Sequence, residues 1–244
     1  CKLYDLMSGM EQATLINKPG WQINIERISS NGQLLLLNSR KVIENPTPNT
    51  PQSGGGGVGF MPQEFVALVF DITDPTNAKS WEPKGTLDPD DDGVIDFSPD
   101  GKYLCTNTQK GLTVFDSTGV VKTELALDNA VRSYAGSWTF RFSSDSRTLV
   151  AGTNIFWGVN NLKPPSSKIY DFHSGNWKEL PGSVGEPQQL GPRGGILLSR
   201  GNLTQRNIDR YEVFDTLTGS SLVKLPELSG PMSALSPDGQ YVAM

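Results

Sequence analysis

The sequence has few of the side chains that most often carry catalytic or redox chemistry. Its 244 residues include one histidine, His173, and two cysteines, Cys1 and Cys105. Cys1 stands at the very end of the sequence and Cys105 inside a predicted strand, so the cysteines do not imply a disulfide framework, and no zinc-type Cys/His spacing occurs. His173 stands in the turn-forming phrase Asp171-Phe-His-Ser-Gly175, where a surface turn residue is a simpler interpretation than a catalytic base. We therefore expect that the chain is not an enzyme.

Long apolar runs and clustered positive charge are missing as well. No apolar run approaches the roughly 20 residues that a membrane-spanning helix requires. The formal net charge is −5 and the 21 lysines and arginines are scattered, whereas a nucleic-acid-binding surface needs a basic patch. We expect neither a membrane span nor a nucleic-acid partner. The sequence leaves the compartment unknown, with a cytoplasmic location slightly favoured.

Turn-forming residues are abundant, with 26 glycines and 17 prolines. Many of them belong to a recurring phrase, here called the hairpin phrase. Its full form is Ser-Pro-Asp-Gly. The proline ring fixes φ, the aspartate side chain hydrogen-bonds the nearby backbone, and the glycine adopts a positive φ. This combination predicts a tight turn between two strands. Successive copies begin 69, 45, 48 and 45 residues apart: Ser29-Ser-Asn-Gly-Gln-Leu-Leu35, Ser98-Pro-Asp-Gly-Lys-Tyr-Leu104, Ser143-Ser-Asp-Ser-Arg-Thr-Leu149, Gly191-Pro-Arg-Gly-Gly-Ile-Leu197 and Ser236-Pro-Asp-Gly-Gln-Tyr-Val242.

A second phrase, here called the aromatic-Asp phrase, alternates with the first. It ends a predicted third strand, and a glycine-containing turn after most copies begins a fourth. Four strands in about 45 residues match the repeat of a β-propeller blade. The five copies are Leu3-Tyr-Asp5, Val69-Phe-Asp71, Val114-Phe-Asp116, Ile169-Tyr-Asp171 and Val213-Phe-Asp215.

Together the two phrases resemble the WD40 repeat family over nearly the whole chain. Phe-Asp or Tyr-Asp stands where that family has Trp-Asp, and no Gly-His dipeptide precedes the first strand. The buried hydrogen-bond tetrad of well-formed WD40 blades is therefore not expected. The resemblance implies an all-β fold, a β-propeller of four-stranded antiparallel blades. Related propellers that bind cofactors or hydrolyse small molecules share the hairpin phrase, which leaves the exact family open.

The phrases divide the chain, as one WD40-like domain, into five blade equivalents. Because it starts at the third strand of a blade and ends at the second, two interpretations stay open. One is a closed five-bladed ring, and the other is a fragment of a larger, seven-bladed propeller. The expected blade ranges are 16–87, 88–127, 136–182, 185–228, and 229–244 completed by 1–15.

Three blades carry extra length between their second and third strands. The distance along the chain from the first residue of the hairpin phrase to the Asp of the aromatic-Asp phrase is 18 residues in the blade that contains 98–116. It is 42 residues over 29–71, 28 over 143–171 and 24 over 191–215. The longest insertion is a flexible Pro- and Gly-rich loop, 40–64. In antiparallel blades these loops leave on one face, which we expect to bind a protein partner. The candidate contacts are side chains typical of interface hot spots: Phe60, Met61, Phe156, Trp157, Arg206 and Arg210. The alternative for Phe156 and Trp157 is that they plug the blade below.

An acidic connection, Asp88-Pro-Asp-Asp-Asp-Gly-Val-Ile-Asp96, fits the pattern Asp-x-Asp-x-Asp-Gly-x-x-Asp. It resembles the calcium loops of EF-hands and of integrin-type propellers, where alternate carboxylates converge on one cation. The resemblance implies Ca²⁺ as a candidate cofactor, although Pro99 replaces the bidentate glutamate of the EF-hand. The alternative is that the acidic residues only solvate the loop. The candidate ligands are Asp88, Asp90, Asp92, the carbonyl of Val94, and Asp96.

Three functions remain in competition at this stage. The favoured one is a non-catalytic scaffold for protein–protein interaction that presents the inserted loops. The second is an enzyme of the lactonase or quinoprotein type, which would need carboxylates, histidine or arginine to converge near the starts of the first strands. The third is a sensor module fused to a signalling domain outside these residues.

Overall fold

The structure, a computed structural model, describes most of the strands that the two phrases predict. The described residues are 1–41, 65–85, 95–108, 111–126, 137–154, 167–180, 186–200, 211–225, 234–236 and 238–243. Their regular elements are twenty β-strands and the two 3-10 turns η1 (Pro75–Asn77) and η3 (Pro192–Gly194). The all-β expectation is therefore confirmed.

Sixteen of the strands form four sheets of four antiparallel strands each. Within every sheet the spatial order follows the chain order, so each sheet is a simple meander. Blade 1 contains β3 (Trp21–Ile28), β4 (Leu34–Lys41), β5 (Phe65–Asp71) and β6 (Lys79–Trp81). Blade 2 contains β7 (Ile95–Phe97), β8 (Tyr103–Thr108), β9 (Gly111–Asp116) and β10 (Val121–Ala126). Blade 3 contains β11 (Ser137–Phe142), β12 (Thr148–Asn154), β13 (Lys168–Asp171) and β14 (Asn176–Glu179). Blade 4 contains β15 (Glu186–Leu190), β16 (Ile196–Arg200), β17 (Tyr211–Asp215) and β18 (Ser221–Lys224).

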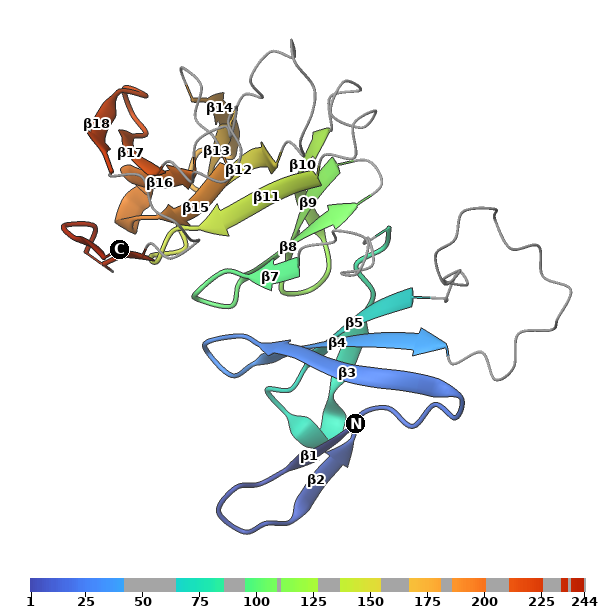
Figure 1. The fold of residues 1–244 in the computed structure, drawn as a ribbon. Helices are drawn as coiled ribbons and strands as arrows, with labels where there is room; N and C mark the ends of the chain where they lie inside the picture. The colour runs from blue at the N-terminus through green and yellow to red at the C-terminus, as the bar shows by residue number, and fades with distance from the viewer. Residues whose placement is uncertain are drawn as a thin grey trace, which may run out of the picture.

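The sheets follow one another along a curved row, from the N-terminal end to the C-terminal end (Figure 1). At its two ends the row carries half-blades of two strands, β1 (Lys2–Tyr4) with β2 (Glu11–Thr14), and β19 (Ala234–Leu235) with β20 (Val242–Ala243). Among the described residues these half-blades are two separate sheets. Their union into one shared blade stays a prediction.

The strand registers show why the two phrases belong together. The residue that follows each hairpin turn pairs with the Asp of the aromatic-Asp phrase, as Leu34 with Asp71 and Tyr103 with Asp116. Blades 3 and 4 repeat this pairing with Asp171 and Asp215. Both phrases therefore lie at one end of the strands, here called the hairpin end. The connections between second and third strands lie at the opposite end, here called the insertion end.

Apolar side chains fill the space between consecutive blades. Because side chains alternate across a strand, each blade contributes one set to either neighbour. Leu36 and Val69 of blade 1 form one cluster with Leu104 and Phe115 of blade 2. A second cluster joins blades 2 and 3 and a third joins blades 3 and 4. A fully buried leucine contributes about 1.5–3 kcal/mol, so this stacking holds the blades at fixed positions.

Candidate functional site

Most of the predicted site residues lie outside the described part of the chain. This holds for the candidate partner contacts Phe60, Met61, Phe156, Trp157, Arg206 and Arg210. It also holds for four of the five candidate calcium ligands, Asp88, Asp90, Asp92 and Val94. The protein-binding face and the calcium site therefore stay predictions.

Asp96 is the one candidate calcium ligand that the structure describes. It lies on β7, the first strand of blade 2, where its Oδ1 is 2.6 Å from Nη1 of Arg27 on β3. Both side chains are partly exposed, at 35% and 53%. This ion pair joins the first strands of two neighbouring blades, so Asp96 has a structural partner in the protein itself.

Other polar side chains on the first strands also reach the next blade. Arg141 on β11 donates from Nε to the carbonyl oxygen of Gln188 on β15 at 2.8 Å. Gln189 on β15 bonds both backbone groups of Leu235 on β19, donating to its carbonyl oxygen at 2.8 Å and accepting from its N–H at 2.7 Å. These groups hold first strands to one another.

The hairpin phrase forms the same closed turn in four of its five copies. In Ser98-Pro-Asp-Gly, the Ser98 hydroxyl donates to Asp100 Oδ1 at 2.8 Å and accepts from the N–H of Tyr103 at 3.0 Å. Asp100 Oδ1 also accepts from the N–H of Lys102 at 3.1 Å. The turns that begin at Ser29, Ser143 and Ser236 repeat this pattern.

The copy that begins at Gly191 has neither the serine nor the aspartate. It forms the 3-10 turn η3 instead, and the hydroxyl of Thr216 donates to the carbonyl oxygen of Gly194.

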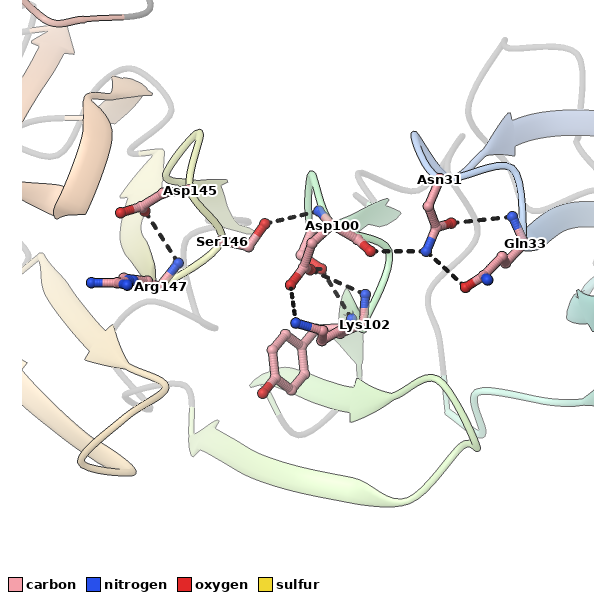
Figure 2. A network of polar contacts seen from close by, with 9 residues as sticks. Asn31, Gln33, Asp100, Lys102, Asp145, Ser146 and Arg147 are labelled. Atoms are coloured by element: carbon pink, nitrogen blue, oxygen red, sulfur yellow. Dashed lines mark hydrogen bonds and ion pairs between the residues drawn. The ribbon is translucent and has the colours of Figure 1, made fainter.

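Neighbouring hairpin turns are bonded to one another across blades 1, 2 and 3 (Figure 2). Asn31 donates from Nδ2 to the carbonyl oxygen of Asp100 at 2.9 Å. The N–H of Asp100 in turn donates to Oγ of Ser146 at 2.9 Å. Both backbone groups of Asp100 are thus satisfied by the turns on either side, which forms a continuous polar row along the hairpin end.

Ser146 is the fourth residue of its hairpin phrase and follows Asp145. Three other copies have a glycine at this position, after an asparagine or an aspartate. Its φ is +59°, and the corresponding glycines Gly32, Gly101 and Gly239 have φ of +71°, +72° and +73°. A side chain is disfavoured in this left-handed conformation. The inter-blade hydrogen bond of its hydroxyl offsets that cost.

The aspartates of the aromatic-Asp phrase cap the next turn. Asp116 Oδ1 accepts from the N–H of Thr118 at 2.9 Å and from that of Val120 at 3.1 Å. Burial opposes the charged form of Asp116, but hydrogen bonds from Thr118 and Val120 outweigh it and lower the pKa of this carboxyl below 3.8. Asp5, Asp71, Asp171 and Asp215 accept from the N–H two residues on in the same way. The conformation of the turn therefore explains the Asp of the phrase.

Two simpler expectations are confirmed. His173 lies exposed in the turn between β13 and β14, at the hairpin end, and its N–H donates to Asp171 Oδ1 at 2.7 Å. Cys105 is fully buried in β8 and unpaired. Burial raises the pKa of its thiol well above 9.0, so Cys105 is an inert core residue.

At the insertion end, the apolar layer between blades 1 and 2 gives way to polar side chains. Asn38 on β4 and the threonines of β8 and β9 are buried there. A pocket of about 370 Å³ opens beside them, lined by Thr108, Thr113, Phe115 and residues of two further segments. Of the lining residues, only Phe115 belongs to one of the two phrases, and nothing in those phrases indicated a pocket there. The signal present in the sequence is the change from apolar to polar residues along second strands, as in Leu34–Lys41.

The described ranges contain neither a cluster of metal-binding side chains nor a membrane-spanning helix. No three His, Cys, Asp or Glu side chains gather there into a group that could hold a metal ion. No helix in this part of the protein has the length and apolarity needed to cross a lipid bilayer.

The meander sheets, their stacking in a curved row and the bonded turns define the class of protein. The chain is an all-β propeller of four-stranded antiparallel blades. No protein-family model matches the chain, and no curated protein is significantly similar to it in sequence.

Solved structures of propeller proteins share the fold. An oligogalacturonate lyase in complex with manganese is 13% identical with a TM-score of 0.56, over 99% of this chain and 66% of that one. Dipeptidyl peptidase 4 of Porphyromonas gingivalis is 12% identical with a TM-score of 0.52, over 89% of this chain and 35% of that one. Hydrazine synthase of Kuenenia stuttgartiensis is 14% identical with a TM-score of 0.50, over 88% of this chain and 53% of that one. The chain thus spans about a third to two thirds of their length, and identities this low support the fold alone.

Proposed function

We propose that this propeller is a non-catalytic, WD40-like scaffold that binds a protein partner at its insertion end. The observation that carries the proposal is the register of the blades. The connections 42–64, 155–167 and 201–210 all leave from the ends of second strands, opposite the hairpin turns. Surface loops on a rigid support are where binding residues concentrate. The corresponding connection in blade 2 is short, since Thr108 pairs with Gly111.

The contacts at the first strands favour a scaffold over a propeller enzyme. An enzyme of the lactonase or quinoprotein type needs charged side chains free to meet a substrate near the starts of those strands. The paired charged side chains that the structure describes lie closer to the hairpin end. Arg27 is instead paired with Asp96, and Arg141 donates to the backbone carbonyl oxygens of Phe140 and Gln188. These side chains support the stacking of the blades, which a binding platform requires.

The proposal is tested by crosslinking the chain to its partners in a cell extract and mapping the crosslinked residues by mass spectrometry. The test variant combines Phe156→Ala and Trp157→Ala with Arg206→Ala and Arg210→Ala. The matched control carries Gln33→Ala and Lys102→Ala on hairpin turns. A scaffold loses its partner in the test variant and keeps it in the control. Crosslinks confined to the hairpin end, or capture that is equal in both variants, would contradict the proposed face.

A further inference from the structure

The pocket between blade 2 and the connection that leaves blade 1 combines an apolar surface with two opposite charges at its edge. Phe115 and Val121 supply the apolar surface, and Lys84 and Glu124 are exposed side chains of the lining. Its volume of about 370 Å³ lies within the range of small-molecule sites.

The two charges come from different elements. Lys84 lies on the connection that leaves blade 1 after β6, and Glu124 lies on β10, the outermost strand of blade 2. No ion pair joins Lys84 to Glu124 in the described structure, although both line the same pocket. An ammonium group and a carboxylate that line one pocket but form no ion pair with each other can each bind an oppositely charged group of a ligand.

The polar side chains beside the apolar surface are held in place by burial. Thr108 and Thr113 are only 5% and 4% exposed, with their hydroxyl oxygens 3.5 Å apart. Asn38, 3% exposed, has a buried Oδ1 without a hydrogen-bond partner. It follows Leu34 and Leu36 at two-residue spacing on β4, so it faces the same interface with blade 2. The polar groups are therefore fixed in place before any ligand arrives.

We propose that this pocket binds a free α-amino acid with an aliphatic side chain. The α-ammonium group of the ligand pairs with Glu124 and its α-carboxylate pairs with Lys84. Its aliphatic side chain lies against Phe115 and Val121. Because the two charges are exposed, each contact is weak and the affinity lies in the millimolar range.

The test is a chemical-shift titration of the ¹⁵N-labelled full chain with three related probes. L-Leucine carries both charges, L-leucinamide lacks the carboxylate, and 4-methylpentanoate lacks the ammonium group. The variants are Glu124→Gln and Lys84→Gln. The matched controls are Glu212→Gln and Lys224→Gln, an opposite pair of charges that face each other across β17 and β18 of blade 4.

Leucine is expected to shift resonances around Thr113 and Phe115 saturably. Glu124→Gln weakens the binding of leucine and leucinamide about threefold, as expected for an exposed ion pair, and leaves 4-methylpentanoate unchanged. Lys84→Gln weakens leucine and 4-methylpentanoate and leaves leucinamide unchanged, and the blade 4 variants change nothing. The proposal is overturned by the absence of saturable leucine shifts, by saturable shifts elsewhere, or by variants that weaken all three probes equally. The spectrum of each variant without ligand shows whether it is folded.

Discussion

The hydroxyl of Ser146 accepts a hydrogen bond from the N–H of Asp100 across the boundary between blades 2 and 3, at 2.9 Å. The two residues belong to successive copies of one phrase, 46 residues apart. A departure from the consensus, serine in place of glycine, thus creates a bond between blades.

Substitutions at Ser146 separate the hydrogen bond from the backbone strain. Ser146→Ala removes the acceptor and keeps a side chain at φ +59°, so we expect the free energy of unfolding to fall by about 1 kcal/mol. Ser146→Gly loses the same bond but relieves the strain, which is worth about 1 kcal/mol. It should therefore lie within about 0.5 kcal/mol of the wild type. Urea denaturation of the full chain measures both, and an alanine variant at least as stable as the glycine variant would contradict the argument.

Gly101 and Gly32 form a matched pair for testing the close approach of neighbouring turns. Both have positive φ, but a Cβ at Gly101 would lie 2.5 Å from the Asn31 amide, whereas nothing lies within 4 Å of one at Gly32. Gly32→Ala should cost about 1 kcal/mol for the backbone alone.

Gly101→Ala should cost about 1–3 kcal/mol more than Gly32→Ala, because the side chain of Asn31 must move and its bond to Asp100 is lost. Thermal unfolding of the two variants under one set of conditions gives the difference. Equal losses would show that the turns do not restrain each other in solution.

Asp116 makes stability depend on pH in the acid range. Its hydrogen bonds hold the pKa of the folded carboxyl below 3.8. Its contribution is therefore complete above the pKa of the unfolded chain and is lost as the pH falls through the lower pKa of the folded state. Asp116→Asn keeps the acceptor without the charge. Because solvent screens this partly exposed carboxylate, the variant should be less stable at pH 7 by about 0.5 kcal/mol.

The difference between Asp116→Asn and the wild type should shrink as the pH falls below about 4. Denaturation midpoints between pH 7 and pH 2.5 provide the comparison. A constant difference over that whole range would contradict the capping role of the ionised carboxyl.

The outer strands of blades 2 and 3 are joined by a side-chain hydrogen bond. Trp177 donates from Nε1 to Oγ1 of Thr123 at 2.9 Å. In a double-mutant cycle of Trp177→Phe and Thr123→Val, we expect a coupling energy of about 1 kcal/mol. The cycle removes the separate packing loss of Trp177 against Tyr170, and strictly additive effects would argue against the bond.

The sequence predicts the interior of each blade well, because the information there is local. The turn at Ser98, its positive-φ glycine and the strands on either side follow from residues within one phrase. The Asp that ends each aromatic-Asp phrase is likewise explained by the turn that follows it. In both cases a few adjacent residues determine the conformation.

The contacts between blades were not predicted, because their partners are separated by a whole repeat. Asp100 and Ser146 are 46 residues apart, as are Gln189 and Leu235, while Arg27 and Asp96 are 69 apart. These separations match the spacing of the hairpin phrases, so aligning the copies beneath one another would have indicated which positions meet. The pocket at Lys84 depends on side-chain packing between blade 2 and the connection that leaves blade 1, which repeat spacing alone does not reveal.

The polar row along the hairpin end also determines where the protein tolerates added sequence. Asp100 bonds both neighbouring turns through its backbone, and Asn31 bonds Asp100 through its side chain. A peptide grafted at either residue would therefore break contacts between blades. A graft in the short turn between Thr108 and Gly111 would leave that row intact. Tags or sensors engineered there would spare the contacts between turns, but they would lie at the insertion end and beside Thr108 of the pocket.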